Sequence, residues 1–411
     1  MNVTQSFRLA IKSLVTSKMR SLLTMLGIII GVAAVIIIIS LGNGLQGMVD
    51  EQVNKMGVNL LQTYVWGRGD GTTMILDPQQ MYDLVDQNPD LLLGVSPYVS
   101  VSAKVRRGDT LYDKTKLYGV SEVMYNRSTG NTLDGERLAK GRFLQYLDVE
   151  RRQNVCVIGA YLEQEAFQGD ALGKTLTVGG RAFTVVGVLQ ANSDALTKGG
   201  RDDQMYIPYE IALELQKSRN VSLYVFTSTS RDTAPAAKQV INSMLLDYFQ
   251  DPDAFYTQTM EEQAAMINTM MGVAMAVLVA IAAISLVVGG IGIMNIMLVS
   301  VTERTREIGI RKSLGAKRRD IRMQFIIEAG TTSAIGGVLG ILFGGLLATG
   351  LGSLFGGMLS AQMNGATFNA TPTLGAVTVS FGVSVGIGIL FGYLPANKAA
   401  KLNPIDALRY D

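Results

Sequence analysis

The sequence contains no histidine, and only one of its 411 residues is a cysteine. Histidine is the commonest metal ligand and general base, so its absence argues against most metalloenzymes and against Ser-His-Asp hydrolases. The single thiol, Cys156, cannot form a disulfide within the chain, and we expect it to be a buried structural residue. Charged residues are also scarce, at 17% against 48% hydrophobic residues. This composition is typical of a membrane protein with more than one domain.

Charge is distributed unevenly along the chain. Residues 300–322 hold eight basic and three acidic side chains, whereas no charged residue occurs from Gln263 to Thr302. A short basic loop between membrane-spanning segments belongs on the cytoplasmic side of a membrane. Residues 45–262 hold 28 acidic against 21 basic residues, which fits a domain on the opposite side. We therefore predict that residues 300–322 are a cytoplasmic loop.

Hydropathy and segment length predict how the chain crosses the membrane. Four segments are apolar for long enough to span it, at residues 21–41, 263–299, 323–352 and 373–394. We predict an amphipathic cytoplasmic helix at residues 1–20, for which the solvated start of the first span is the alternative. Residues 353–372 are then a short extracytoplasmic loop and residues 395–411 a cytoplasmic tail, so that both termini are cytoplasmic. A cleaved signal peptide competes with the first span, but no A-x-A site follows it.

Residues 42–262 are long enough to bury a core of their own, and we predict an extracytoplasmic domain with stalk segments at both ends. Runs rich in β-branched and aromatic residues predict strands, and Gly179 with Gly180 predicts a two-residue hairpin turn between two of them. Pro78 after Asp77 predicts the start of a helix. The predicted fold is a membrane protein with four transmembrane α-helices and a large mixed α/β extracytoplasmic domain between the first and the second.

The uncharged segment that follows this domain is longer than a bilayer requires. As one helix, its 40 residues would extend for about 60 Å, twice the bilayer core of about 30 Å. We expect extended stalk helices, with a break at Gly289, Gly290 and Gly292 as the alternative. Small residues at four-residue spacing in the first and third spans predict close helix packing. These residues are Gly27, Gly31, Gly336, Gly340 and Gly344.

The basic loop has the pattern of two helices joined by a corner. Glu307 and Arg311 are four residues apart in the acid-first order that stabilises a helix. We predict one helix from about Thr302 to Leu314, which stops at Gly315 because glycine adopts a left-handed conformation easily. A second helix restarts between Lys317 and Asp320 and continues into the third span.

This loop resembles the cytoplasmic loop of MacB-type permeases, the ABC-transporter group that includes the lipoprotein-release permeases and FtsX. Residues 12–35 (KSLVTSKMRSLLTMLGIIIGVAAV) and 392–411 (GYLPANKAAKLNPIDALRYD) are similar to the two ends of that family, so the resemblance covers the whole chain. It implies that the loop helix docks on an ATPase. The expected docking residues are Glu303, Arg304, Arg306, Glu307, Ile308, Ile310, Arg311, Lys312 and Leu314. The alternative is that these charges only set topology and bind anionic membrane lipid.

The resemblance also implies a function and its partners. It implies a homodimer in the cytoplasmic membrane of a bacterium, inner or sole, bound to a separate ABC ATPase that carries ATP and Mg²⁺, while this chain binds no cofactor. Fused ATPases precede the first span in this family, and about twenty residues precede it here. Export of peptides, antibiotics or amphiphiles with an extracytoplasmic adaptor protein is the favoured function. Lipoprotein release, FtsX-like regulation of cell-wall hydrolases and a membrane-anchored enzyme are the alternatives.

Three further features carry weaker signals. Glu328, near the cytoplasmic start of the third span, either reaches the interface or pairs with an arginine of the basic loop. Residues 169–175 (GDALGKT) are one residue short of a phosphate-binding loop, and we predict a turn there. Residues 382–386 (GVSVG) match a nucleophile elbow, but no histidine can serve as base for Ser384.

Basic residues of the predicted extracytoplasmic domain are interspersed with acids, which argues against nucleic-acid binding.

Overall fold

The computed structural model describes residues 18–56, 59–67, 75–126, 131–133, 135–192, 196–360 and 368–408. The chain divides into two compact units. One, here called the membrane unit, consists of Met1–Gly47, Thr269–Gly356 and Phe368–Asp411. The other, here called the α/β unit, consists of Met48–Asn268 with Gly357–Thr367. The surface helix expected at residues 1–20 lies almost wholly outside the described residues.

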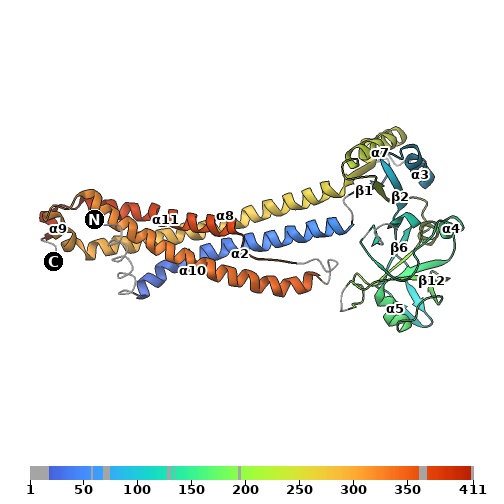
Figure 1. The fold of residues 1–411 in the computed structure, drawn as a ribbon, viewed down its shortest axis with the longest axis horizontal. Coiled ribbons are helices and arrows are strands. Elements are labelled where there is room, and N and C mark those ends of the chain that lie inside the picture. The colour runs from blue at the N-terminus through green and yellow to red at the C-terminus, as the bar shows by residue number, and fades with distance from the viewer. Residues whose placement is uncertain are drawn as a thin grey trace. The chain divides into compact units, whose positions relative to one another are not determined.

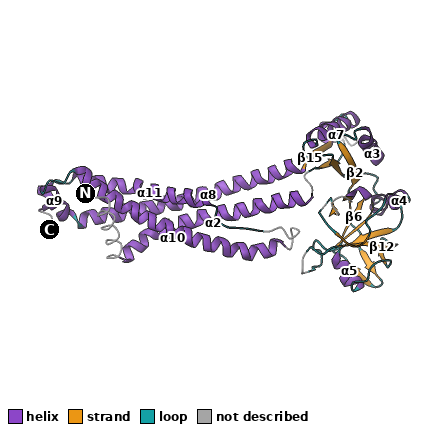
Figure 2. Ribbon diagram, in the orientation of Figure 1, coloured by secondary structure: helices purple, strands orange, loops and turns teal. Residues whose placement is uncertain are grey.

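Among the described residues, four helices are long and apolar enough to cross a membrane. They are α2 (Lys18–Met56), α8 (Met260–Glu303), α10 (Arg318–Ser360) and α11 (Leu374–Lys401). Figure 2 shows that the strands belong to the α/β unit, which the sequence inserts between α2 and α8. The predicted fold class is therefore confirmed. α10 continues into the expected loop at residues 353–372, and α11 continues through Pro395.

Helix α8 is a single element of 44 residues. At 1.5 Å per residue it is about 66 Å long, more than twice the bilayer core of about 30 Å. It runs through Gly289, Gly290 and Gly292 without interruption, so the alternative of a break at these glycines is wrong. An apolar helix of this length is the extended helix that the sequence predicts.

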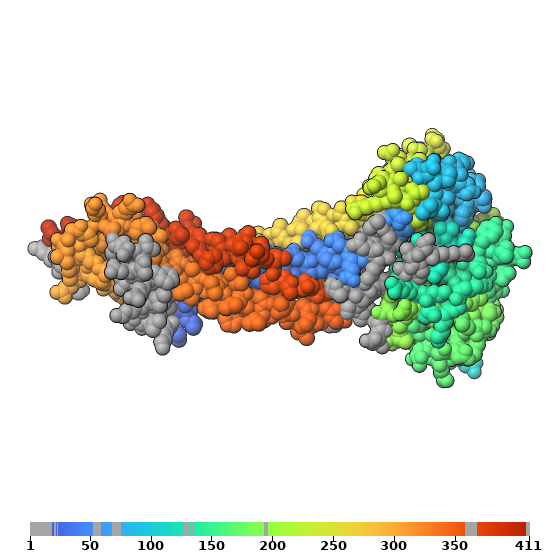
Figure 3. Space-filling view, viewed as in Figure 1, coloured from blue at the N-terminus to red at the C-terminus, as the bar shows by residue number. Residues whose placement is uncertain are grey.

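Glycines allow the helices of the membrane unit to approach closely. A Cβ atom on Gly27 of α2 would lie only 2.7 Å from the Cα of Gly289 in α8. On α10, a Cβ atom on Gly340 would lie 2.8 Å from the Cβ of Val32. The remaining predicted glycines face neighbouring helices in the same way. These are Gly31 against Leu286, Gly336 against Ile28, and Gly344 against Ala33. α11 (red) lies along α10 (orange) in Figures 1 and 3.

The α/β unit contains two main sheets. The first is antiparallel, in the order β15 (Phe255–Thr259), β1 (Leu60–Val65), β14 (Leu223–Ser228) and β2 (Leu92–Pro97). Helix α7 (Ala234–Phe249) packs against β15 and β1, and α3 (Pro78–Gln87) packs against β2. The Asp77 side chain accepts a hydrogen bond from the Gln79 N–H and so caps α3 as predicted.

The second sheet is mixed, because β10 pairs in parallel with β12, and β6 with β13, whereas its other pairs are antiparallel. Its order is β3 (Val99–Val101), β6 (Lys116–Val120), β13 (Gln204–Pro208), β10 (Val155–Ile158), β12 (Arg181–Leu189), β11 (Thr175–Val178), β4 (Val105–Arg107) and β5 (Thr110–Tyr112), with β9 (Leu138–Gly141) on β12. The unit also contains three short α-helices, two 3-10 helices and a further strand pair. They are α4 (Tyr146–Glu150), α5 (Ala160–Phe167), α6 (Tyr209–Gln216), η1 (Glu122–Met124), η2 (Pro252–Ala254), and β7 (Tyr125–Asn126) with β8 (Asn131–Thr132). Val178 pairs with Arg181 across Gly179 and Gly180, which confirms the hairpin.

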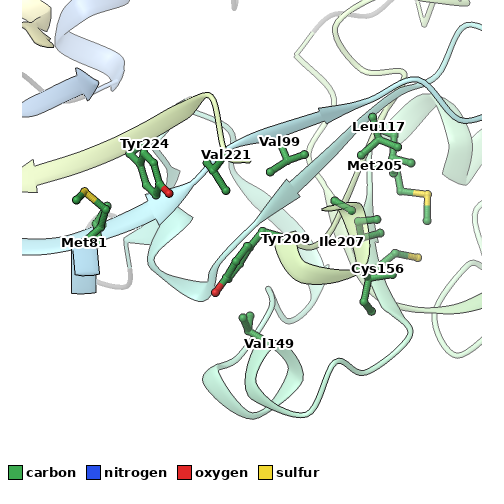
Figure 4. Close-up of a cluster of buried hydrophobic side chains, with 14 of the residues drawn as sticks. Met81, Val99, Leu117, Val149, Cys156, Met205, Ile207, Tyr209, Val221 and Tyr224 are labelled. Carbon is green, nitrogen blue, oxygen red and sulfur yellow. The ribbon is translucent and has the colours of Figure 1, made fainter. Parts of the chain in front are cut away.

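Hydrophobic side chains from both sheets form the core of the α/β unit. Figure 4 shows part of it, with Tyr224, Val221 and Tyr209 in one cluster that also includes Cys156. Burial raises the pKa of Tyr209 to about 12. Cys156 is fully buried, as predicted, and burial raises the pKa of its thiol far above the ordinary value.

Candidate functional site

The basic loop forms a short helix held between two membrane-spanning helices. α8 ends at Glu303, Arg304 is not helical (φ −100°, ψ 13°), and α9 (Thr305–Ser313) follows. The prediction of one helix from Thr302 to Leu314 is therefore wrong at its N-terminal end. Gly315 has a φ of +95° and α10 begins at Arg318, which confirms the predicted glycine corner and restart.

Arg304 pairs with the one carboxylate of α10 that is buried near the loop. Its Nη1 lies 3.4 Å from both carboxylate oxygens of Glu328, whose side chain is only 10% exposed. A carboxylate at this depth is costly unless a cation compensates its charge. Of the two interpretations of Glu328, the structure shows the pairing with a loop arginine.

Two further basic side chains of α9 are bound inside the membrane unit. The Arg311 Nη1 donates a hydrogen bond of 2.6 Å to Oε1 of Gln324, which is 5% exposed, and its Nη2 donates to Glu307. The Lys312 Nζ donates a 2.5 Å hydrogen bond to the carbonyl oxygen of Leu402. Burial, and next the positive charge of Arg318, lower the pKa of Lys312.

The C-terminal segment supports α9 as well. Helix α12 (Pro404–Leu408) packs against α9, close to the Lys312–Leu402 hydrogen bond. Ile308 of α9 is 2% exposed and belongs to the same buried cluster as Ile321 and Phe325 of α10. Ile308 therefore packs inside the membrane unit, and its place in the predicted docking set stays a prediction.

The side chains of the other five predicted docking residues are exposed on the surface of the loop. Arg306, Ile310 and Leu314 are four residues apart, so they share one helix face. Ile310 is 46% exposed and Leu314 is 83% exposed, and Glu303 and Glu307 are also exposed. We call these five residues the outer face of α9, which includes Glu303 at the end of α8 and Leu314 directly after α9. The predicted set of nine thus separates into side chains that hold α9 in place and side chains that face outward.

Gln324 is a supporting residue that the sequence interpretation missed. It precedes Glu328 by four residues on α10, so the two polar side chains share the helix face that receives Arg311 and Arg304. The signal was present in the sequence. A glutamine and a glutamate four residues apart at the start of an apolar span indicate a buried polar contact.

The two rejected motifs have structural roles. Residues 169–175 connect α5 to β11, whereas a phosphate-binding loop follows a strand and precedes a helix. Ser384 lies in α11 and its Oγ donates a 2.9 Å hydrogen bond to the carbonyl oxygen of Ser333 in α10. The Ser333 Oγ donates in return to the carbonyl oxygen of Ser384 at 2.5 Å. The serine of the GVSVG motif therefore joins two membrane helices.

Four spanning helices, an α/β unit inserted between the first two, and a short helix between the second and third define a multi-pass membrane protein. Residues 21–243 match the family described as MacB-like periplasmic core domain, and residues 279–404 match the family described as FtsX-like permease C-terminal. The chain belongs to the MacB-like, FtsX-like family of ABC transporter permeases. Its α/β unit is the extracytoplasmic domain of that family.

Relatives cover nearly the whole chain. The macrolide export ATP-binding/permease protein MacB of Neisseria gonorrhoeae (strain ATCC 700825 / FA 1090) is 36% identical, over 99% of this chain and 61% of that protein. MacB of Bdellovibrio bacteriovorus is 36% identical, over 97% of this chain and 61% of that protein. The chain thus spans about three-fifths of the length of the curated relatives it matches. The solved periplasmic region of MacB from Actinobacillus actinomycetemcomitans is 20% identical with a TM-score of 0.43, over 53% of this chain and 97% of that one.

Proposed function

We propose that this chain is the permease of an ABC transporter and that an ATPase docks on the outer face of α9. The observation that carries the proposal is the exposure of two large apolar side chains, Ile310 in the charged helix α9 and Leu314 directly after it. Apolar side chains rimmed by charges are typical of protein interfaces. The ATPase is a separate subunit in this proposal, and it binds the ATP and Mg²⁺.

The same proposal assigns a path for the energy of hydrolysis. When the ATPase displaces α9, the side-chain contacts of Arg304 and Arg311 displace α10 as well. The displacement also passes to α8 along the backbone, because α8 ends at Glu303, two residues before α9 begins. α8 then continues without a break to Met260, where the extracytoplasmic domain begins. Closure of the ATPase therefore moves the extracytoplasmic domain, and we infer export, because the relatives are macrolide export proteins. Peptides, antibiotics and other amphiphiles are the proposed substrates, with an adaptor as partner and with both termini in the cytoplasm.

A second copy of the chain is the proposed partner of α8. Large apolar side chains recur along one side of α8 at intervals of three or four residues and are more than half exposed. They are Met270, Val273, Val277, Ile281 and Ile284. At 1.5 Å per residue, Ile281 lies about 33 Å and Met270 about 50 Å along α8 from its end at Glu303. A bilayer core of about 30 Å that begins at Glu303 therefore leaves Met270 to Ile281 outside the lipid. A Val273→Cys variant should cross-link between copies, and Met275→Cys should not, because Met275 contacts Gly42 of the same chain.

The docking proposal is tested by ATP hydrolysis of the candidate ATPase with and without this chain in lipid nanodiscs. Ile310→Glu and Leu314→Glu should each lower the stimulation about tenfold, because each places a negative charge in an apolar contact at the centre of the interface. Lys398→Glu, an exposed charge change on α11, is the matched control and should leave it unchanged. Stimulation that survives both α9 substitutions would exclude docking on this face. The 411-residue chain alone should hydrolyse no ATP.

A further inference from the structure

The passage from the extracytoplasmic domain into α8 has no linker. Strand β15 ends at Thr259 and α8 begins at Met260. Met260 is 5% exposed and belongs to a hydrophobic cluster with Leu60 and Val225 of the neighbouring strands. The first residue of the 44-residue helix is therefore part of the domain core.

Thr259 and Glu262 cap each other at this passage. The Thr259 N–H donates a 3.0 Å hydrogen bond to the Glu262 carboxylate, and the Glu262 N–H donates a 3.1 Å hydrogen bond to the Thr259 Oγ1. This reciprocal pair is a capping box, which satisfies backbone groups that would otherwise lack partners at a helix start. The pair also fixes the direction in which α8 leaves β15.

Two basic side chains from α7 and the segment before it form ion pairs with the first turn of α8. The Lys238 Nζ lies 2.8 Å and 2.7 Å from the two carboxylate oxygens of Glu262. Arg231, in the segment before α7, contacts both oxygens of Glu261, at 2.7 Å and 3.1 Å. The Arg231 guanidinium lowers the pKa of Glu261. Burial acts to raise the pKa of Glu262, but the Lys238 ammonium and the Thr259 N–H outweigh burial and lower it.

Glu262 thus combines two contacts that come from different elements. One carboxylate accepts from the backbone of β15 and from the side chain of α7, and it belongs to the first turn of α8. An exposed ion pair alone contributes little, because solvent screens it and two long side chains lose their freedom. A carboxylate that is also the capping group is different, since its removal frees both contacts at once.

We propose that Glu262 is a positioning residue that fixes the first turn of α8 to β15 and α7, so that a movement of this turn is passed to the extracytoplasmic domain. This inference rests on the proposed function, in which α8 delivers movement to the domain. The opposite end of α8 is built differently, because Arg304 interrupts the helix there. The two ends of α8 thus differ, with a capped start in the domain and an interruption next to α9.

We call the contact of the first turn of α8 with β15 and α7 the joint. It is tested by the distance between two spin labels, one on Ser243→Cys of α7 and one on Met266→Cys of α8. Both positions are exposed, and the measurement uses the full chain in nanodiscs. Glu262→Ala should broaden the distance distribution at least about twofold, since both contacts are lost. Lys238→Met, which keeps the cap, should broaden it less, and Lys238→Arg should restore the parent width. A Glu262→Ala distribution as narrow as the parent's would overturn the proposal, even if the domain unfolds at a lower temperature.

A second experiment measures whether ATP hydrolysis changes the environment of a spin label on the extracytoplasmic domain. It uses ATP, Mg²⁺ and orthovanadate in the presence of the ATPase. With Glu262→Ala, the permease should still stimulate ATP hydrolysis, while the label on Ser243→Cys should lose its nucleotide-dependent change in environment. A change as large as the parent's would overturn the role of Glu262 in coupling. If the parent itself stimulates no ATPase, the proposed function fails, and the width of the label distribution still decides whether Glu262 fixes the joint.

Discussion

The guanidinium of Arg304 and the carboxylate of Glu328 meet at 3.4 Å at the point where α8 gives way to α9. The two residues are 24 positions apart in the sequence, on different helices. The pair compensates a buried negative charge and holds α9 against α10. Helix α9 is therefore positioned by contacts within the membrane unit itself.

This pair predicts unequal effects of removing its two partners. Arg304→Met should destabilise the membrane unit by about 1 to 3 kcal/mol, because it leaves a buried carboxylate without a cation. Glu328→Gln should cost less, since the amide is neutral and still accepts a hydrogen bond. Thermal unfolding in detergent micelles measures both. An Arg304→Met/Glu328→Met variant should be more stable than Arg304→Met, and additive losses in the double variant would show that the two residues do not interact.

Close helix packing predicts that Gly27 does not tolerate a large side chain. Gly27→Leu should lower stability by about 1 to 3 kcal/mol, because a Cβ atom there lies 2.7 Å from the backbone of Gly289. Gly382→Leu in α11 is the control, since a Cβ atom at Gly382 meets no atom within 4 Å. The measurement is the Tm of each variant in the same detergent. Equal Tm values for the two variants would contradict the α2–α8 contact.

Cys156 should be unreactive in the folded protein. Its thiol is fully buried in the α/β core and its pKa is raised by burial, so both access and thiolate formation are suppressed. A maleimide reagent at pH 8 should label the chain only after unfolding in urea. Since the folded pKa is the higher one, this thiol lowers stability only as the pH rises above its ordinary pKa of about 8.5. Rapid labelling without urea would place Cys156 at an accessible surface.

The joint at Glu262 should loosen in acid. The pKa values of Glu261 and Glu262 are both lowered in the folded protein. Their contribution is therefore present above the ordinary carboxyl pKa of about 4.3 and is lost as the pH falls through the lowered values. The label distribution between Ser243→Cys and Met266→Cys should broaden in that range. A Glu261→Gln/Glu262→Gln background should show no such transition, and a transition that persists there would assign the effect to other groups.

Sequence patterns predicted correctly those features that depend only on residues close together in the chain. A bilayer core of about 30 Å requires about twenty consecutive apolar residues, so composition alone locates four spans. Asp77 caps α3 through a neighbouring backbone N–H, and Gly179 with Gly180 supplies the left-handed turn between β11 and β12. The stop at Gly315 follows from the same conformational freedom, with a φ of +95°.

The arrangement of the candidate site required contacts between distant residues. The sequence pattern places Ile308 and Ile310 in one helix and does not tell which of them is buried. In the structure, Ile308 is buried against Ile321 and Phe325, whereas Ile310 is exposed. Lys312 is bound to Leu402, 90 positions away, and no local rule links these residues. The sequence by itself determined the spans, their order, the inserted domain and the family. Only the tertiary structure decided which charges hold α9, which of its residues are exposed, and how Glu262 contacts β15 and α7. Each of these depends on side chains that folding alone brings together.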